Sequence, residues 1–240
     1  MKNSDLAQLK IEQPPATLRE IVQERMRDAI ISGLFEPGER LVERPLCDQL
    51  GVSRTVIRET IRYLEAEGLV EIMANRGPIV ARLSRDDARQ IYEIRRMLEG
   101  AAAMACAEKC AIEGGAELER DLSAALARLE GAFDETRAGA LFKASTGFYQ
   151  VIFEAAGHHI AWEVVNRLNG RISRLRAMTL AAQQRQQPGL SHMQAICAAI
   201  LAGEPALARA AVEAHIADAA AVAERLLLDA ENKEAALEGS

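Results

Sequence analysis

The chain has 240 residues and a formal net charge of −6 at pH 7, with 49% hydrophobic and 27% charged residues. That length allows one large or two ordinary domains, and the composition is that of a soluble globular protein. No stretch approaches the roughly 18 consecutive apolar residues of a membrane span, and residues 1–13 lack the apolar core of a secretory signal, so we expect a cytoplasmic protein without membrane contact.

The acidic excess lies mainly in the second part of the chain. Residues 17–82 contain ten arginines and eleven acidic residues, whereas residues 83–240 contain 17 basic and 22 acidic residues. The first segment is thus nearly neutral, so a role in DNA binding depends on where its arginines point. The cysteines form no CxxC pair; Cys106 and Cys110, four residues apart, are either a metal or redox pair or, as we expect, buried small apolar residues.

The first expected helix follows a polar stretch. Residues 1–16 end in two prolines and predict a flexible tail. Thr17, with Glu20 three residues later, forms a capping box for a helix that ends at Gly33. The apolar stripe of this helix consists of Ile21, Val22, Met26, Ala29 and Ile30.

Residues 36–82 have the pattern of two helices followed by a hairpin. The expected elements are a turn at 36–39, a possible short strand at 40–42, a helix at 44–50, a second helix from Ser53 to about Glu67, and strands at 69–73 and 78–82 joined by a turn. Gly51 and Gly68 end the two helices. Residues 17–82 therefore predict a winged helix-turn-helix domain.

The second of these helices has two chemically different sides. Its apolar side is formed by Ile57, Ile61 and Leu64, and its basic side by Arg54, Arg58 and Arg62. A helix fixed by its apolar side can enter the major groove, where arginine reads guanine or binds phosphate. The alternative is an arginine face that merely solvates a surface helix; the adjoining helix, turn and hairpin favour DNA. The expected DNA-binding residues are Arg44, Ser53, Arg54, Thr55, Arg58, Arg62, Asn75, Arg76 and Gly77.

The periodicity becomes entirely helical after Leu83. Ser84 caps a long helix that runs through about Cys110. Further helical segments are separated at Gly114-Gly115, Gly139, Gly157, Pro188-Gly189 and Gly203-Glu204-Pro205. We expect residues 84–230 to form an all-α bundle of about six helices and residues 231–240 to be a tail. The fold class is mostly α, with one small β-hairpin.

The first domain contains the motifs Arg40-Leu41, Glu43-Arg44, Leu50-Gly51-Val52-Ser53-Arg54, Arg58-Glu59, Leu64-Glu65-Ala66-Glu67-Gly68-Leu69-Val70 and Asn75-Arg76-Gly77. They resemble the GntR-type winged-helix domain of bacterial transcription regulators, over nearly all of residues 17–82. The resemblance implies that Arg44, Arg54 and Arg58 make the main DNA contacts, completed by the wing around Arg76-Gly77. Where the family commonly has an acidic or polar residue, this chain has Pro45, which suits the first turn of a helix.

The second domain contains Ile91-Tyr92-Glu93-Ile94-Arg95, Leu98-Glu99, the stretch from Phe142 to Gly157, and an alanine-rich stretch from His192 to His215. These resemble the FCD domain, the helical ligand-binding module of the FadR branch of the same family. Many FCD domains hold a divalent metal with an Asp and a His four residues apart, plus two later histidines. His192 and His215 stand at the later positions, but Ser145 and Tyr149 replace the first pair. Since a hydroxyl and a phenol are poor ligands at neutral pH, we expect no metal and no other cofactor.

A metal-free polar cavity is the interpretation that we favour for these residues. The expected effector-binding residues are Arg95, Ser145, Tyr149, His192 and His215. Arg95 either anchors a ligand carboxylate or pairs with Glu99, its neighbour at i+4. Without the resemblance, the two histidines would be core residues that each make one hydrogen bond.

The two domains together predict a transcription repressor and not an enzyme. We expect a homodimer that binds palindromic double-stranded operator DNA, because dimer symmetry matches half-site symmetry. We expect a small metabolite, an organic acid or a related compound, to bind the second domain. The resemblance implies that this ligand releases a repressor from DNA, and activation is left open. Two alternatives remain: a DNA-binding dimer without an effector, and a metal-dependent hydrolase, against which Ser145 and Tyr149 argue.

Overall fold

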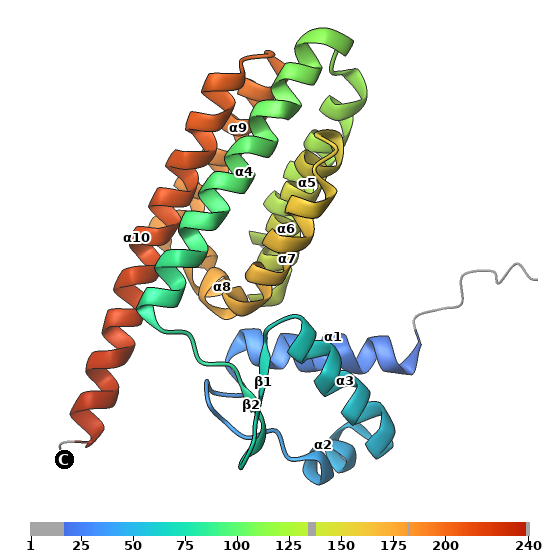
Figure 1. Cartoon of the computed structure of the whole chain (residues 1–240), viewed down its shortest axis with the longest axis vertical. Helices are drawn as coiled ribbons and strands as arrows, with labels where there is room; N and C mark the ends of the chain where they lie inside the picture. The colour runs from blue at the N-terminus through green and yellow to red at the C-terminus, as the bar shows by residue number, and fades with distance from the viewer. Residues whose placement is uncertain (1–16, 134–137, 182, 239–240) are drawn as a thin grey trace, which may run out of the picture.

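A computed structural model describes residues 17–133, 138–181 and 183–238. Within them, a small group of helices and a hairpin at the N-terminal end adjoins a bundle of long helices (Figure 1). The predicted fold class, a mostly helical protein with an N-terminal winged helix-turn-helix and a C-terminal helical bundle, is confirmed. The tail that we expected at residues 1–16 lies outside the described residues.

Helix α1 (Leu18–Ser32) begins at the predicted capping box. The Thr17 backbone N–H donates to Glu20 Oε2 at 2.7 Å, and the Glu20 N–H donates to Thr17 Oγ1 at 3.3 Å. The buried residues of the helix are Val22, Met26, Ile30 and Ile31. Ile21, which the sequence placed in the stripe, is 41% exposed, because it lies at the edge of a stripe whose main members are four residues apart.

Helices α2 (Glu43–Leu50) and α3 (Arg54–Ala66) form the helix-turn-helix. Gly51 joins them with a φ of 66°, in the left-handed region that glycine adopts without steric cost. The Ser53 hydroxyl accepts the Val56 N–H at 3.4 Å and so caps α3, as predicted.

The hairpin consists of β1 (Val70–Met73) and β2 (Gly77–Val80), which pair antiparallel with Val70 opposite Val80. The short strand proposed for residues 40–42 is absent from this described segment. Arg40 makes only an isolated bridge to Ile79, because the chain enters α2 directly after Val42. The wing is therefore a two-stranded sheet with a single bridging residue beside it.

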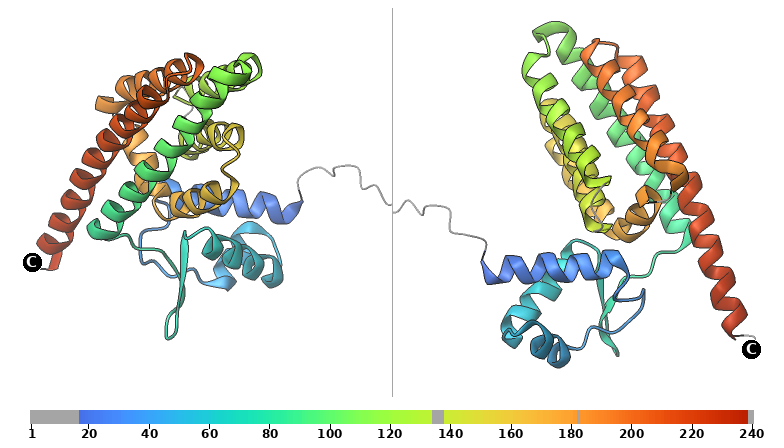
Figure 2. Two further views of the ribbon diagram at one scale, coloured as in Figure 1. Left: turned by 45° about the horizontal axis from the view of Figure 1, so that its top comes forward. Right: turned by 180° about the vertical axis from the view of Figure 1, so that it is seen from behind.

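The bundle contains α4 (Arg85–Glu113), α5 (Ala116–Phe133), α6 (Ala138–Ala155), α7 (His159–Arg171), α8 (Ser173–Ala181), α9 (Gln183–Leu201) and α10 (Pro205–Glu238). The sequence predicted about six helices; the described residues form seven segments, because α7 and α8 are separate helices that meet at Ile172. In Figures 1 and 2, α10 runs alongside α4 and extends past the end of the bundle. Residues 231–238, which we expected to be a tail, are thus the last turns of α10.

One predicted helix break does not occur: Pro188-Gly189 lies inside α9. The break predicted at Gly139 is confirmed, because α5 ends at Phe133 and α6 begins at Ala138. Proline and glycine disfavour a helix interior locally, but packing of α9 against α4, α5 and α10 outweighs that preference. Local propensity therefore misplaced helix ends in this part of the chain.

The bundle core takes up three of the cysteines as small apolar side chains. Cys106, Cys110 and Cys197 are buried in the same hydrophobic cluster and are free thiols. Burial raises the pKa of the Cys106 thiol to about 12, so it is not a thiolate at neutral pH. None of the described helices combines the length and the apolar character needed to cross a membrane.

The small domain and the bundle share an interface along α1. Helix α1 lies against α6 and α8. Ala177 of α8 is part of the buried core of the small domain, and Phe142 of α6 lies against that core. Lys143 Nζ and Glu24 Oε1 form an ion pair across the interface at 3.1 Å. The bundle helices α6 and α8 are therefore in direct contact with the domain that carries the helix-turn-helix.

Candidate DNA-binding surface and buried polar cluster

The basic side of α3 faces solvent. Arg54, Arg58 and Arg62 are all exposed. The opposite side of the helix is buried in the core of the small domain through Ile57, which has no exposed surface, together with Ile61 and Leu64. The apolar side fixes the orientation of α3, so the three guanidinium groups project away from the protein. This arrangement fits a helix that enters a major groove.

Arg58 has an acidic neighbour on α2. Its Nε donates to Glu43 Oε1 at 2.8 Å, and both side chains are at the surface. The hydrogen bond raises the pKa of Arg58 and lowers the pKa of Glu43, so both groups are charged at neutral pH. A DNA phosphate that binds Arg58 therefore competes with Glu43 for the same guanidinium.

Arg40 is a basic residue near this surface that the sequence analysis did not select. Arg40, Arg44 and Arg54 line one small depression of about 300 Å³, between the loop before α2, the start of α3 and the wing residue Pro78. All three side chains are exposed. Three guanidinium groups around one hollow suit a phosphate. The isolated position of Arg40 outside any helix removed the periodicity that would have indicated it.

The tip of the hairpin carries the remaining predicted DNA contacts. Asn75 and Arg76 are exposed, and the Arg76 N–H donates to the Met73 carbonyl at 3.2 Å to close the turn. Gly77 has a φ of 73°, so a residue with a side chain would be strained there. Ser53 and Thr55 are exposed at the N-terminal end of α3, where free backbone N–H groups attract anions. The predicted DNA-binding residues thus lie on the helix-turn-helix and the wing.

The predicted effector-binding residues come together inside the bundle. Tyr149 of α6 and His215 of α10 have ring centroids 6.2 Å apart, and His192 of α9 lies 5.8 Å from His215. Ser145, one turn before Tyr149 on α6, is fully buried. Three helices therefore contribute to one polar cluster, in which Ser145, Tyr149 and His215 are buried and His192 is half-buried. Whether this cluster holds an effector stays a prediction.

Arg95 adopts the second of the two roles that we considered. Its Nε donates to Glu99 Oε1 at 2.7 Å and its Nη2 approaches Glu99 Oε2 at 3.3 Å, so the pair is bidentate. Arg95 and Glu99 are 1% and 0% exposed in their side chains. Burial and the nearby Glu99 carboxylate also raise the pKa of Tyr149 well above its usual value. Arg95 is therefore charge-neutralised, and Tyr149 keeps its proton at neutral pH.

Arg176 of α8 is the member of the cluster that the sequence analysis missed. It is 4% exposed, and its Nη2 donates to Ser145 Oγ at 2.6 Å. Its guanidinium carbon lies 5.5 Å from the centroid of the Phe142 ring. Arg171, five residues earlier, is exposed, so the arginines of this stretch differ in burial. Periodicity alone does not tell which arginine of such a set is buried.

The cluster does not fit a divalent metal. The described residues contain no group of three or more His, Cys, Asp or Glu side chains placed to hold a metal ion. At Ser145, where the resemblance implies an aspartate, the hydroxyl accepts a hydrogen bond from the cationic Arg176. A second cation at this position would be repelled rather than bound. Among the described residues, His192 and His215 therefore do not belong to a group of three metal-ligand side chains.

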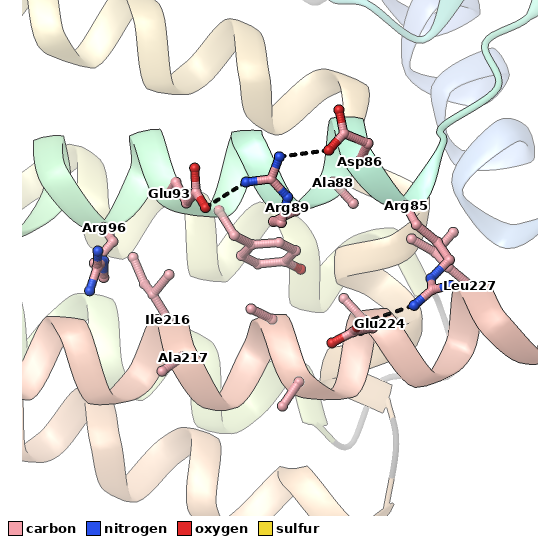
Figure 3. Close-up of a pocket in the computed structure, with 14 residues that line it drawn as sticks. Arg85, Asp86, Ala88, Arg89, Glu93, Arg96, Ile216, Ala217, Glu224 and Leu227 are labelled. Atoms are coloured by element: carbon pink, nitrogen blue, oxygen red, sulfur yellow. Dashed lines mark hydrogen bonds and ion pairs between the residues drawn. The ribbon is translucent and has the colours of Figure 1, made fainter.

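A separate groove of about 640 Å³ lies on the outside of the bundle between α4 and α10 (Figure 3). Arg89 pairs with Asp86 and Glu93 along α4, and Arg85 bridges to Glu224 on α10. Tyr92 lines this groove, and the guanidinium of Arg95 lies 5.4 Å from the centroid of its ring. Tyr92 thus lies between the groove and the buried cluster.

Comparison with known protein families gives two matches that together cover most of the chain. The model of the family described as bacterial regulatory proteins, gntR family, matches residues 18–80, and the model of the FCD domain matches residues 90–218. An HTH-type transcriptional regulator of Mycobacterium tuberculosis is 30% identical over 233 residues, covering 87% of this chain and 91% of that protein. The HTH-type transcriptional repressor RspR of Escherichia coli is 25% identical, covering 69% of this chain and 71% of its own length.

Solved structures show the same fold. A transcriptional regulator from Rhodococcus sp. is 24% identical and superimposes with a TM-score of 0.68, covering 85% of this chain and 96% of its own. McbR/YncC of Escherichia coli is 19% identical, with a TM-score of 0.71 and a coverage of 88% and 99%. The arrangement of a winged helix-turn-helix beside a helical bundle is therefore shared with both.

Proposed function

The chain belongs to the GntR family of bacterial regulatory proteins and carries an FCD domain, which makes it an HTH-type transcription regulator rather than an enzyme, and from this premise we propose that it is a repressor released from its operator by an organic acid. The similar protein RspR is itself named a repressor. In the proposed mechanism, the effector binds the buried polar cluster and lowers the affinity of the winged helix-turn-helix for DNA.

The observation that carries the proposal is the orientation of α3. Its buried side leaves Arg54, Arg58 and Arg62 exposed along one edge. The other predicted DNA contacts, Arg44 and the residues at the hairpin tip, are exposed as well. In our proposal the arginines of α3 read base edges in the major groove, whereas Arg44, Ser53 and the wing bind phosphates and the backbone.

The proposed regulator acts as a homodimer on a palindromic operator. One reading helix covers only a few base pairs, whereas two helices related by twofold symmetry read two half-sites about one helical turn apart. Dimerisation therefore multiplies both affinity and specificity. This proposal predicts a footprint with twofold symmetry and a complex of two chains per operator.

Effector control requires a ligand that distinguishes two placements of the DNA-binding domain. Helices α6 and α8 connect the two regions, because both contribute residues to the buried cluster and both contact α1. A ligand that changes the packing of Ser145 against Arg176 also acts on Phe142 and Ala177 at the domain interface. This shared interface supports a coupling between effector and operator.

The DNA-binding part of the proposal is tested with duplexes selected from a random pool by the full-length protein. We expect Arg54→Ala to weaken binding to the selected operator by about 1–3 kcal/mol in fluorescence anisotropy, and Arg58→Ala to weaken it as well. Arg120→Ala is the matched control, since Arg120 is an exposed arginine on α5. Unchanged affinity in both α3 variants would show that α3 does not read the operator.

The effector part is tested by mass spectrometry of small molecules that copurify with the protein, followed by titration of each identified compound into the protein–operator complex. We expect an organic acid that dissociates the complex. Compounds that bind without changing operator affinity would favour the alternative of a DNA-binding dimer without effector control. A compound that strengthens operator binding would make the protein a corepressor-dependent regulator and contradict release by the effector.

A further inference from the structure

The charges of the buried cluster do not balance among the described residues. Arg95 and Arg176 each contribute one positive charge, and Glu99 contributes the single carboxylate. Glu99 is held by Arg95 through both of its oxygens. Residues 180–188, which follow in the sequence, contain no Asp or Glu. Among the described residues, Arg176 is therefore a buried cation without a carboxylate of its own.

The immediate surroundings of Arg176 leave one of its donors unused. Nη2 is bound to the Ser145 hydroxyl, and one side of the guanidinium faces the Phe142 ring. In the described part of the chain, Nη1 is fully buried and has no hydrogen-bond partner. Buried charges in proteins are normally paired, because an unpaired one loses its hydration without compensation. Within the described part of the chain, Arg176 is an exception to this rule.

The guanidinium remains charged in this environment. Burial, together with the neighbouring positive charge of Arg95, lowers the pKa of Arg176 to about 10. At neutral pH almost all molecules therefore carry the proton on Arg176. Arg95, Arg176 and Glu99 together carry a net charge of +1, which favours a monoanion.

We propose that Arg176 is the fixed cation of the effector site and binds one carboxylate group of the ligand directly. The proposal rests on the proposed function, in which the effector occupies this cluster. The planar guanidinium matches a carboxylate, and Nη1 supplies a free donor. Ser145 Oγ accepts from Arg176, so its hydroxyl hydrogen can be donated to the same carboxylate.

Two consequences distinguish this site from a metal site. Binding needs no divalent ion, so a chelator leaves it unchanged. The site discriminates by charge, because an uncharged amide of the same shape does not neutralise Arg176 and brings a competing N–H donor. Arg176, which would bind the ligand carboxylate, is followed directly by Ala177, which belongs to the core of the DNA-binding domain.

The test measures the thermal stability of the full-length protein, with EDTA present and ionic strength held constant with sodium chloride. The probes are matched pairs: acetate and acetamide, pyruvate and pyruvamide, lactate and lactamide, benzoate and benzamide. We expect at least one carboxylate to raise the Tm of the wild type in proportion to the logarithm of its concentration, with no comparable effect of its amide. Arg176→Met should abolish this rise, whereas Arg167→Met, which removes an exposed arginine of α7, should retain it.

A measurement without ligand separates a binding role from a structural one. An arginine kept for ligand binding destabilises the empty protein, so Arg176→Met should have a Tm equal to or above that of the wild type. If Arg176→Met does not fold, Arg176→Lys keeps the charge but loses the planar fork, and it should retain a weakened response to the carboxylate. The lysine variant then takes its place in the same assay.

Three results would overturn the proposal. They are a wild type that no carboxylate of the panel stabilises, an equal response in the wild type and the Arg176 variants, and a response that EDTA removes. Operator binding in the absence of ligand is measured in parallel. A wild-type protein that binds no operator would contradict the proposed function. The thermal shifts test the role of Arg176 independently of DNA.

Discussion

The arginines that we assign to ligand binding are exposed in one domain of this protein and buried in the other. The winged helix-turn-helix displays Arg54, Arg58 and Arg62 at its surface, where water hydrates each guanidinium and no fixed partner is needed. The helical bundle encloses Arg95 and Arg176, where each charge requires a partner. Exposed arginines are thus free to meet a large anionic surface such as DNA. A buried arginine restricts which small molecules can bind inside the bundle.

This contrast shows which charges are informative about ligands. Surface arginines are common, so a single one indicates little. On α3, the grouping of three arginines on one side of the helix is what suggests DNA binding. A buried arginine is rare, so its partner, or the lack of one, is a physical statement about the site. Arg95 has its partner in Glu99, whereas Arg176 has only a hydroxyl and an aromatic ring. The predictions below change either the buried or the exposed side of this comparison.

The largest effect is expected from Glu99→Ala, which leaves Arg95 without its carboxylate. Two unpaired guanidinium groups would then lie in the same interior. We expect the free energy of unfolding to fall by about 3–5 kcal/mol, because removing one partner of a buried pair leaves an uncompensated charge. Urea denaturation followed by circular dichroism measures the change.

Glu93→Ala is the matched control on the same helix. Glu93 pairs with Arg89 at 2.8 Å, but both side chains are more than half exposed. Water replaces that partner easily, so the control should be close to wild-type stability. Equal losses in the two variants would mean that burial does not distinguish the two pairs and would undermine the comparison between the domains.

A smaller effect is expected from Gly170→Ala at the domain interface. The added methyl group would overlap the backbone carbonyl of Glu67, which follows α3, so the two domains must separate or shift. We expect a loss of about 1–3 kcal/mol in the free energy of unfolding. Effector-induced release of the operator should weaken as well, because the interface that couples the domains is disturbed.

The control for this variant is Gly147→Ala, inside α6, where an added methyl group meets no atom within 4 Å. An alanine there should stabilise the protein by about 0.5–1 kcal/mol, because glycine is the poorer helix former. The coupling between effector and operator is measured as the ratio of operator affinities with and without effector. If Gly170→Ala keeps the wild-type ratio, the contact at Glu67 does not transmit the effect of the ligand to the DNA-binding domain.

The sequence predicted the first domain better than the second. The capping box at Thr17, the turn at Gly51 and the cap at Ser53 were all correct, because each depends on residues within a few positions of one another. The break expected at Pro188-Gly189 was wrong, because contacts between distant helices decide that segment. The short strand expected at 40–42 was also wrong, because the chain enters α2 directly after Val42.

The candidate sites show the same limit. The exposure of the α3 arginines follows from the spacing of Ile57, Ile61 and Leu64 on one helix. The pairing of Arg95 with Glu99 was one of two alternatives that spacing allowed, and the fold decided between them. Arg176 and Ser145 are 31 residues apart on different helices, so no local pattern in the sequence joins them.

The smallest effect is expected from Glu43→Gln, on the exposed side of the comparison. The variant removes the carboxylate that binds Arg58 and also faces Arg54, so it should increase operator affinity by about a few-fold at pH 7 and low salt. Fluorescence anisotropy with the selected operator measures the change. A decrease in affinity would show that Glu43 orients Arg58 for DNA instead of competing with it.

The pH dependence of stability gives this last prediction an independent check. Arg58 lowers the pKa of Glu43 in the folded protein, so the ion pair stabilises the fold fully above the unfolded pKa of about 4.3 and this contribution is lost as the pH falls through the lower folded pKa. The stability difference between wild type and Glu43→Gln should therefore be small at pH 7 and vanish on acidification. Because water screens both side chains, it should stay far below the difference caused by Glu99→Ala. If Glu43 and Glu99 contributed equally to the free energy of unfolding, the exposure of an arginine would not determine how strongly its acidic partner stabilises this protein.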